Sequence, residues 1–270
     1  MRPRTARAVN MLSSAALAAM LALSVAGCKT TGDDTTGSIG TAPAQRTDAD
    51  WRRALDTWRG RYESNPNDVQ AAIAYARALR ATEQRAQAVA VLEQASIRNP
   101  NNTQLLGAFG RALADAGQYP QALDALSRAH TPDNPDWRIL NAQGAVLDQM
   151  ERHAEAQRYY ESALKIVPDE PSVLSNLGLS YALTKDLTRA ETTLRRAVAQ
   201  PGAGPKVRQN LALVVGLQGR FAEAEQIASA DLPPDEAAAN VGYLRQMLAQ
   251  QGDWKKKGGK PIVLSPDAGS

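Results

Sequence analysis

Residues 171–204 read PSVLSNLGLSYALTKDLTRAETTLRRAVAQPGAG, and the small residues of this stretch recur 34 positions earlier and later in the chain. The recurring columns are Ala88, Ala122, Ala156, Ala190 and Ala224; Ala95, Ala129, Ala163 and Ala197; and Ala76, Gly110, Gly144, Gly178 and Ala212. Leu79, Leu113, Leu147, Tyr181 and Val215 form a larger apolar column three residues after the last set. So many aligned columns indicate an internal repeat, which decides the fold before any local pattern is considered.

The period and the columns resemble the tetratricopeptide repeat (TPR), in which each repeat is two antiparallel helices. The resemblance implies an all-α TPR superhelical solenoid over residues 48–250, with about five helix-turn-helix repeats. With Val69 as position 1, the repeats are 69–102, 103–136, 137–170, 171–204 and 205–238. Small residues at positions 8 and 20 allow the two helix axes to approach to about 8–10 Å. Proline near position 32 ends the second helix.

Helices are also expected on either side of these repeats. Residues 48–65 are in phase as the second helix of a leading repeat, because Ala54 and Trp58 occupy positions 20 and 24. Residues 235–250 follow two prolines and predict an amphipathic capping helix. Stacked repeats need such caps, because the end repeats would otherwise expose an apolar face. Residues 251–270 show no helical period and are predicted to be a disordered tail.

Composition agrees with a helical chain and excludes several functions. The 270 residues are 43% hydrophobic but only 5% aromatic, and alanine, the best helix former, is abundant. One cysteine and two histidines leave no disulfide framework and little basis for a metal site. The net charge of +3 comes from Arg2, Arg4 and Arg7, so the rest of the chain is neutral. A neutral body argues against nucleic-acid binding, which usually needs a basic face.

The amino terminus predicts export and lipid attachment. Residues 1–27 contain a basic start and a short apolar segment, as a cleaved signal peptide does. Val25-Ala26-Gly27-Cys28 resembles a bacterial lipobox. That resemblance implies a lipid anchor on Cys28 and, from Lys29, the outer membrane. An ordinary membrane-helix cysteine and a mitochondrial transit peptide are the alternatives. Residues 28–47 are polar and are expected to be the lipidated cysteine and a flexible tether.

No catalytic motif is present, and the chain is predicted not to be an enzyme. There is no phosphate-binding glycine loop, no G-x-S-x-G and no H-E-x-x-H. His130 and His153 are predicted to be surface or packing residues. We therefore expect no cofactor, metal or small-molecule substrate.

What remains is a binding surface for protein. In TPR arrays the first helix of each repeat lines the concave face, and here it would place polar residues in the first three repeats and leucines in the last two. The predicted groove residues are Arg77, Arg80, Gln104, Arg111, Arg138, Asn141, Asp148, Leu179 and Leu213. They suit a peptide with an acidic part and an apolar part. The alternative is that the arginines are solvated helix charges and the leucines contact neighbouring helices.

A lipobox, a polar tether and about five TPRs resemble the TPR lipoprotein of the tight-adherence (Tad/Flp) pilus system, and residues 240–248 are also similar to that family. The resemblance implies a scaffold, anchored in the outer membrane and facing the periplasm, that assists assembly of the pilus secretion apparatus. A secretin or another pilus component would be the partner. The alternative is a general envelope adaptor, for outer-membrane barrel assembly or for recruiting peptidoglycan enzymes.

Overall fold

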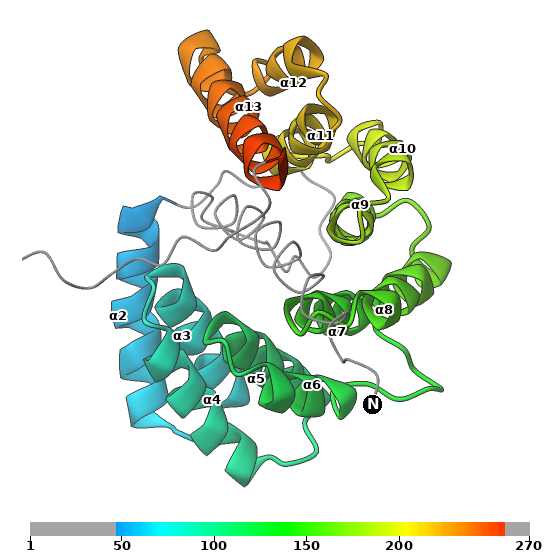
Figure 1. Ribbon diagram of the computed structural model, residues 1–270. Coiled ribbons are helices and arrows are strands. Elements are labelled where there is room, and N and C mark those ends of the chain that lie inside the picture. Colours follow the sequence, from blue (N-terminus) through cyan, green and yellow to red (C-terminus); the bar gives the residue numbers. More distant parts are fainter. Residues whose placement is uncertain (1–46, 257–270) are drawn as a thin grey trace, which may run out of the picture.

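The computed structural model describes residues 47–256. The predicted signal peptide, Cys28 and all of the tether except Thr47 lie outside the described residues, as does the tail beyond Lys256. The described residues form α-helices and no β-strand (Figure 1). None of these helices is long and apolar enough to cross a membrane.

The helices fall in the expected pairs. They are α2 (Asp48–Ser64), α3 (Val69–Ala81), α4 (Arg85–Arg98), α5 (Thr103–Asp115), α6 (Tyr119–Ser127), α7 (Trp137–Gln149), α8 (His153–Ile166), α9 (Pro171–Leu183), α10 (Leu187–Val198), α11 (Pro205–Leu217), α12 (Phe221–Ala228) and α13 (Pro234–Lys256). We call the first helix of a repeat helix A and the second helix B. The five pairs from α3/α4 to α11/α12 are the five predicted repeats, and the predicted TPR solenoid is confirmed.

Each helix A begins and ends at a recurring local signal. The side chains of Asp68 and Asn102 accept hydrogen bonds from backbone N–H groups in the first turns of α3 and α5. After each helix A, position 15 has a positive φ, with residues Glu83 (63°), Gly117 (75°), Glu151 (59°), Lys185 (66°) and Gly219 (84°). This left-handed residue reverses the chain between helices A and B. Glycine adopts it at little cost, whereas glutamate and lysine pay a steric penalty.

Small residues at position 8 allow helices A and B to touch. A Cβ placed on Gly110 would lie 2.6 Å from Leu126 Cγ, and one on Gly178 would lie 2.6 Å from Leu194 Cγ. At Gly144 the nearest atom is Tyr160 Cε1, at 2.5 Å. These distances are too short for a real Cβ, so a larger residue would force the helix pair apart.

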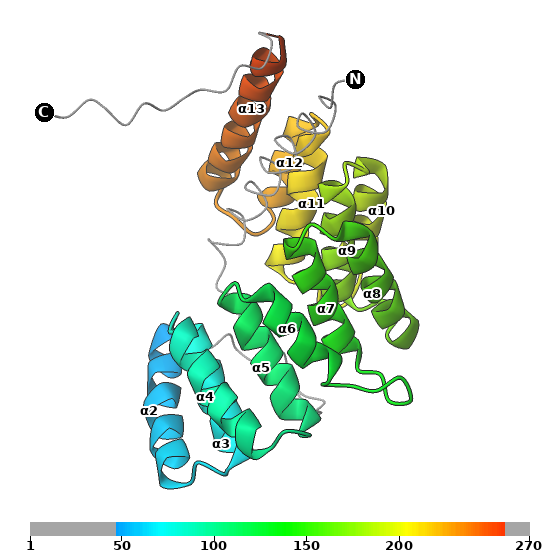
Figure 2. The same cartoon turned by 60° about the horizontal axis from the view of Figure 1, so that its bottom comes forward.

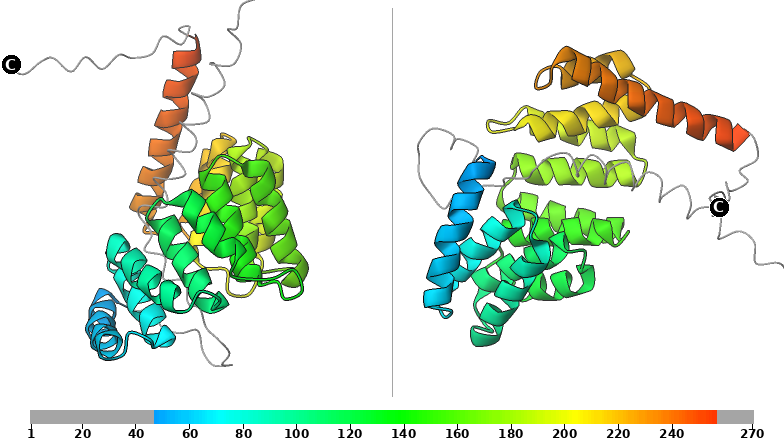
Figure 3. Two further views of the ribbon diagram at one scale, coloured as in Figure 1. Left: turned by 90° about the horizontal axis from the view of Figure 1, so that it is seen from below. Right: turned by 90° about the vertical axis from the view of Figure 1, so that its left-hand side faces the viewer.

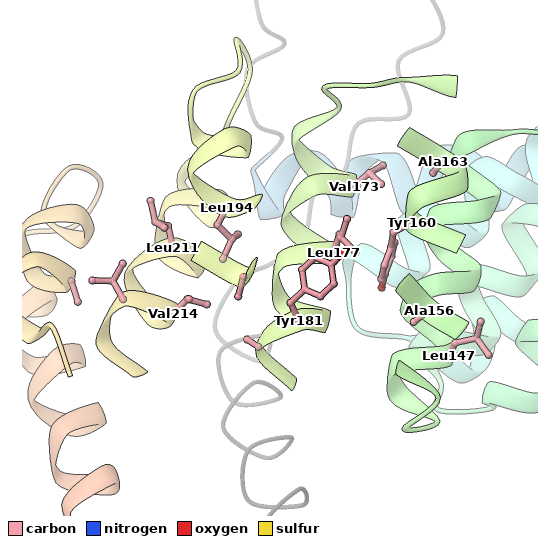
Figure 4. Packing of buried hydrophobic residues seen from close by; sticks show 14 of the residues in the cluster. Leu147, Ala156, Tyr160, Ala163, Val173, Leu177, Tyr181, Leu194, Leu211 and Val214 are labelled. Atoms are coloured by element: carbon pink, nitrogen blue, oxygen red, sulfur yellow. The ribbon is translucent and has the colours of Figure 1, made fainter. Parts of the chain in front are cut away.

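The third, fourth and fifth repeats share one core cluster. Tyr160 on α8 packs with Leu177 and Tyr181 on α9, and the same cluster continues to Leu194 on α10 and Val214 on α11 (Figure 4). Tyr160 and Leu194 are almost completely buried. Because each repeat buries its apolar face against the next one, the stack gains stability from the interfaces between neighbours.

The stack is curved, with the A helices inside. Figure 1 shows α5, α7, α9 and α11 along the inner side of the curve and α6, α8, α10 and α12 along the outer side. The backbones of successive A helices contact each other, from α3 and α5 through α11 and α13. Within residues 47–256 no B helix contacts the backbone of the next B helix. Closer packing inside than outside curves the solenoid.

Charged side chains bridge two of the outer helices. Arg220, just before α12, donates to Glu191 on α10 at 2.8 Å, and Arg195 on α10 donates to Glu223 on α12 at 2.6 Å. Burial alone would raise the pKa of Glu191, but hydrogen bonds from Arg220, Gln218 and Arg195 outweigh it and hold that pKa at about 2. The Glu191 carboxylate therefore stays charged and joins the fourth and fifth repeats on the convex side.

The last helix is longer than the sequence predicted. The predicted cap ended at residue 250, but α13 continues to Lys256, so the first part of the predicted disordered tail is helical. The segment 251–256 contains a single glycine and no proline, and the adjacent pair Gly258-Gly259 and then Pro261 come only afterwards. The strong helix breakers therefore lie several residues further on than the prediction assumed.

Candidate protein-binding groove

The predicted groove residues all lie on A helices. Arg77 and Arg80 are on α3, Gln104 and Arg111 on α5, Arg138, Asn141 and Asp148 on α7, Leu179 on α9 and Leu213 on α11. These helices line the inner side of the curve (Figure 1). The structure thus brings the nine residues to one side of the solenoid, although it gives them different surroundings.

One column follows the inner side through all five repeats. Position 9 holds Arg77, Arg111, Ala145, Leu179 and Leu213, and each of these residues is half-buried. The column changes from two arginines, through alanine, to two leucines. Neighbouring helices are about 8–10 Å apart, so the column extends over a length on the order of 40 Å.

Amide side chains link successive A helices along the same side. Gln70 donates to Gln104 at 2.8 Å, Asn176 donates to Asn141 at 3.0 Å and Asn210 donates to Ser175 at 2.9 Å. Gln104 and Asn141, both predicted for the groove, therefore hold the helices together. The sequence contains a signal for this ladder, because Asn176 and Asn210 are 34 residues apart at position 6.

Three of the groove arginines are held by neighbouring groups. Arg80 Nε lies 2.5 Å from a carboxylate oxygen of Asp115 on the next helix A. The guanidinium of Arg77 lies 5.6 Å from the centre of the Trp51 ring, and that of Arg138 lies 4.5 Å from the Trp137 ring. Cation–π contacts and ion pairs restrict long side chains. A partner would therefore meet arginines that have already lost part of their conformational freedom.

Asp148 does not belong to the groove surface, which corrects the prediction made for it. Its side chain is only 9% exposed. It accepts hydrogen bonds from Ser180 at 2.8 Å and Tyr160 at 3.0 Å, and His153 Nδ1 lies 2.8 Å away. Burial raises the pKa of Asp148, and these hydrogen bonds offset part of that effect. The position-12 side chain of this repeat points into the protein interior rather than into the groove, because polar partners on α8 and α9 stabilise its buried carboxylate.

The cluster contains a serine, a histidine and an aspartate but lacks the geometry of a nucleophile. In a catalytic triad the histidine lies between the serine and the acid and takes the serine proton. Here the Ser180 hydroxyl donates directly to Asp148, and His153 contacts the same carboxylate oxygen. No group of metal-ligating side chains occurs among the described residues. The cluster is a structural junction between the third and fourth repeats.

The apolar half of the predicted groove is formed by half-buried leucines. Leu179 and Leu213 are half-buried, as are Leu183 and Leu217, which lie four residues after them on the same helices. Each leucine therefore exposes part of its surface and buries the rest.

The outer side carries a depression that the sequence analysis missed. Between α4 and α6, above α5, Val89, Phe109 and Ile97 line an open hollow of about 810 Å³. The Ile97 side chain is 68% exposed. A signal was available, because position 29 holds isoleucine here but Thr131 and Lys165 in the next two repeats. This depression is the main rival to the inner groove as a binding surface.

Comparison with known proteins supports the fold. Residues 73–136 and 141–206 match the family described as tetratricopeptide repeat. The chain is similar to a thermophilic TPR protein of Thermus thermophilus, with 20% identity, a TM-score of 0.58, and coverage of 66% of this chain and 99% of that one. It is also similar to PilW, described as a widely conserved type IV pilus biogenesis factor, with 17% identity, a TM-score of 0.62, and coverage of 72% and 91%. A comparison with curated proteins gives no match.

Proposed function

We propose that this protein is a lipid-anchored TPR scaffold of the bacterial cell envelope that assists assembly of a pilus secretion apparatus of the Tad/Flp type. It binds its partner, a secretin or another pilus component, along the inner side of the solenoid. The lipid is attached to Cys28 and places the solenoid at the outer membrane, facing the periplasm.

The position-9 column carries this proposal. Arg77 and Arg111 offer positive charge at one end of the groove, and Leu179 and Leu213 offer apolar surface at the other. A peptide with an acidic part and an apolar part complements both ends. About 12 extended residues would span the column. TPR solenoids usually act as protein-interaction scaffolds rather than as enzymes, which agrees with the lack of a nucleophile geometry at Ser180.

The choice of a pilus system rests on two weaker supports. One is the resemblance of the lipobox, tether and repeats to the Tad/Flp lipoprotein. The other is the similarity in fold to PilW, a type IV pilus biogenesis factor. The alternative is a general envelope adaptor for barrel assembly or for peptidoglycan enzymes, which would use the same groove for another partner.

Complementation of a deletion strain tests this function. We expect deletion to remove the multimers of the secretion pore and the wild-type gene to restore them. Arg111→Glu reverses charge in the groove and should fail to restore the multimers. Arg158→Glu makes the same change on α8 at an exposed position of the outer side, and should restore them. Melting curves of both variants would show that the solenoid is intact.

Two outcomes would contradict the proposal. Pore multimers that persist in the deletion strain, together with broad envelope defects, would favour the general adaptor. Full restoration by Arg111→Glu would mean that the basic end of the groove is not the working surface.

A further inference from the structure

The last helix has the features of a helix A without a helix B. Ala237, Val241 and Leu244 on α13 are buried, and α13 contacts both α11 and α12. Asn240 and Gly242 have the same spacing as Asn176 and Gly178 on α9, which occupy positions 6 and 8. The helix α13 is therefore the first half of a sixth repeat, displaced from the 34-residue frame because helix B of the fifth repeat, α12, has only 8 residues where α10 has 12.

Among the described residues, none covers Gly242 on the side of α13 that should receive a helix B. A Cβ placed on Gly242 would meet nothing within 4 Å. The equivalent glycines of complete repeats meet Leu126, Tyr160 or Leu194, all of which occupy position 24 of their helix B. Tyr243, next to Gly242, is 59% exposed. Complete repeats of this chain thus show what fits over Gly242: a helix with a large residue at position 24.

The first described helix, α2, has the features of a helix B without a helix A. Trp51 and Leu55 on α2 are buried against α3, as a helix B packs on the following repeat. Ala54 and Trp58 occupy positions 20 and 24 but are only half-buried. The residues at those positions in α8 and α10, among them Tyr160 and Leu194, are buried. Within the described part of the chain, no helix A of its own covers Ala54 and Trp58.

The two half repeats do not meet within one chain. Figure 2 shows α2 and α13 at opposite ends of the solenoid, and the right-hand view of Figure 3 also separates them. Between these two described helices there is no contact.

The charges at the helix ends are complementary. Helices A and B of a repeat run antiparallel, so the start of α13 would lie against the end of α2. The first turn of α13 carries Asp235 and Glu236, and the last turn of α2 carries Arg61. At the other end, the acidic first turn of α2 would face the half of α13 that contains Arg245. Opposite charges would therefore meet at both ends of the helix pair.

We propose that α13 of one copy docks on α2 of a second copy, so that two half repeats from different molecules form one complete TPR. Trp58 of the second copy covers Gly242 as Tyr160 covers Gly144. The two surfaces differ, so the contact is head-to-tail and leaves one open end on each copy for further addition. This self-assembly is separate from partner binding in the groove.

Disulfide crosslinking between two differently tagged copies of the full chain tests the proposal in cells. One copy carries Gly242→Cys and the other carries Trp58→Cys. The control pairs Gly242→Cys with Gly60→Cys, another position on α2, where a side chain meets nothing within 4 Å. A parallel sample without added cysteines gives the background from Cys28. We expect a mixed-tag dimer from the 242/58 pair and background levels from the 242/60 pair.

Co-purification of the two tagged copies gives a second readout. Gly242→Leu fills this site without clashing with the described residues of its own chain, so it should abolish co-purification and leave the melting temperature unchanged or slightly raised. Gly60→Leu and the groove variant Arg111→Glu should both retain it. Absence of the 242/58 dimer, equal crosslinking at position 60, a crosslink from 242 to another protein only, or co-purification that survives Gly242→Leu would each overturn the proposal.

Discussion

Replacing Gly178 by leucine is expected to destabilise the solenoid by about 3 kcal/mol, since overpacking a filled core forces side chains and backbone to move. A Cβ at this position would lie 2.6 Å from Leu194 Cγ and 3.3 Å from the backbone oxygen of Ala190. The side chain of Leu194 could make room for the new Cβ only if α10 moved away from α9. The remaining atoms of the new side chain would have no space at all.

Chemical denaturation of the variant and of the wild type measures this effect. Gly60→Leu is the matched control, because it makes the same substitution on an open helix surface. The control should leave stability unchanged or raise it by about 0.5–1 kcal/mol, since glycine is a poor helix former. Equal denaturation midpoints for Gly178→Leu and the wild type would show that position 8 is wrongly assigned.

Replacing Asp148 by alanine is expected to cost about 3 kcal/mol, because it removes the acceptor shared by two buried side chains, Tyr160 and Ser180, and by the half-buried His153. The Tyr160 hydroxyl, on an almost fully buried side chain, would lose its acceptor. Ser180 and His153 would lose theirs as well. The damage should fall on the junction between the third and fourth repeats.

Asp148→Asn separates hydrogen bonding from charge. Asparagine has the same shape but only one carbonyl oxygen, so it can keep the hydrogen bond from Ser180, which goes to Oδ1, or the one from Tyr160, which goes to Oδ2, but not both. We expect this variant to lose only about 1 kcal/mol. Hydrogen exchange would localise the loss, with faster exchange in α7 to α9 of the alanine variant. Asp148→Ala with wild-type stability would mean that the carboxylate is not the centre of the junction.

The repeat made most of the fold predictable from sequence. The 34-residue spacing together with the resemblance to the TPR pattern set the frame, and Gly110, Gly144 and Gly178 each lie where a helix B touches its helix A. The helix ends were harder to predict. The extension of α13 to Lys256 depended on where helix breakers are absent. The short helix α12 shifts α13 out of the 34-residue frame, which hid the match between Asn240-Val241-Gly242 and Asn176-Leu177-Gly178.

The groove was less predictable than the fold. Position numbers placed Asp148 on the groove surface, because they could not show that Tyr160, Ser180 and His153 converge on its buried carboxylate from two other helices. The pairing of Arg80 with Asp115, on the next helix A, also depends on three-dimensional contacts. Such contacts decide which polar residues face a partner and which hold the scaffold together.

The most direct test of the groove is photo-crosslinking in living cells from position 111, with position 158 on the outer side as control. A photoreactive residue replaces Arg111 in one strain and Arg158 in the other, and mass spectrometry identifies the adducts. The account predicts an adduct between position 111 and a secretin or another pilus component, and none with that protein from position 158. Adducts from position 158 and none from position 111 would contradict the claim that the inner side binds the partner.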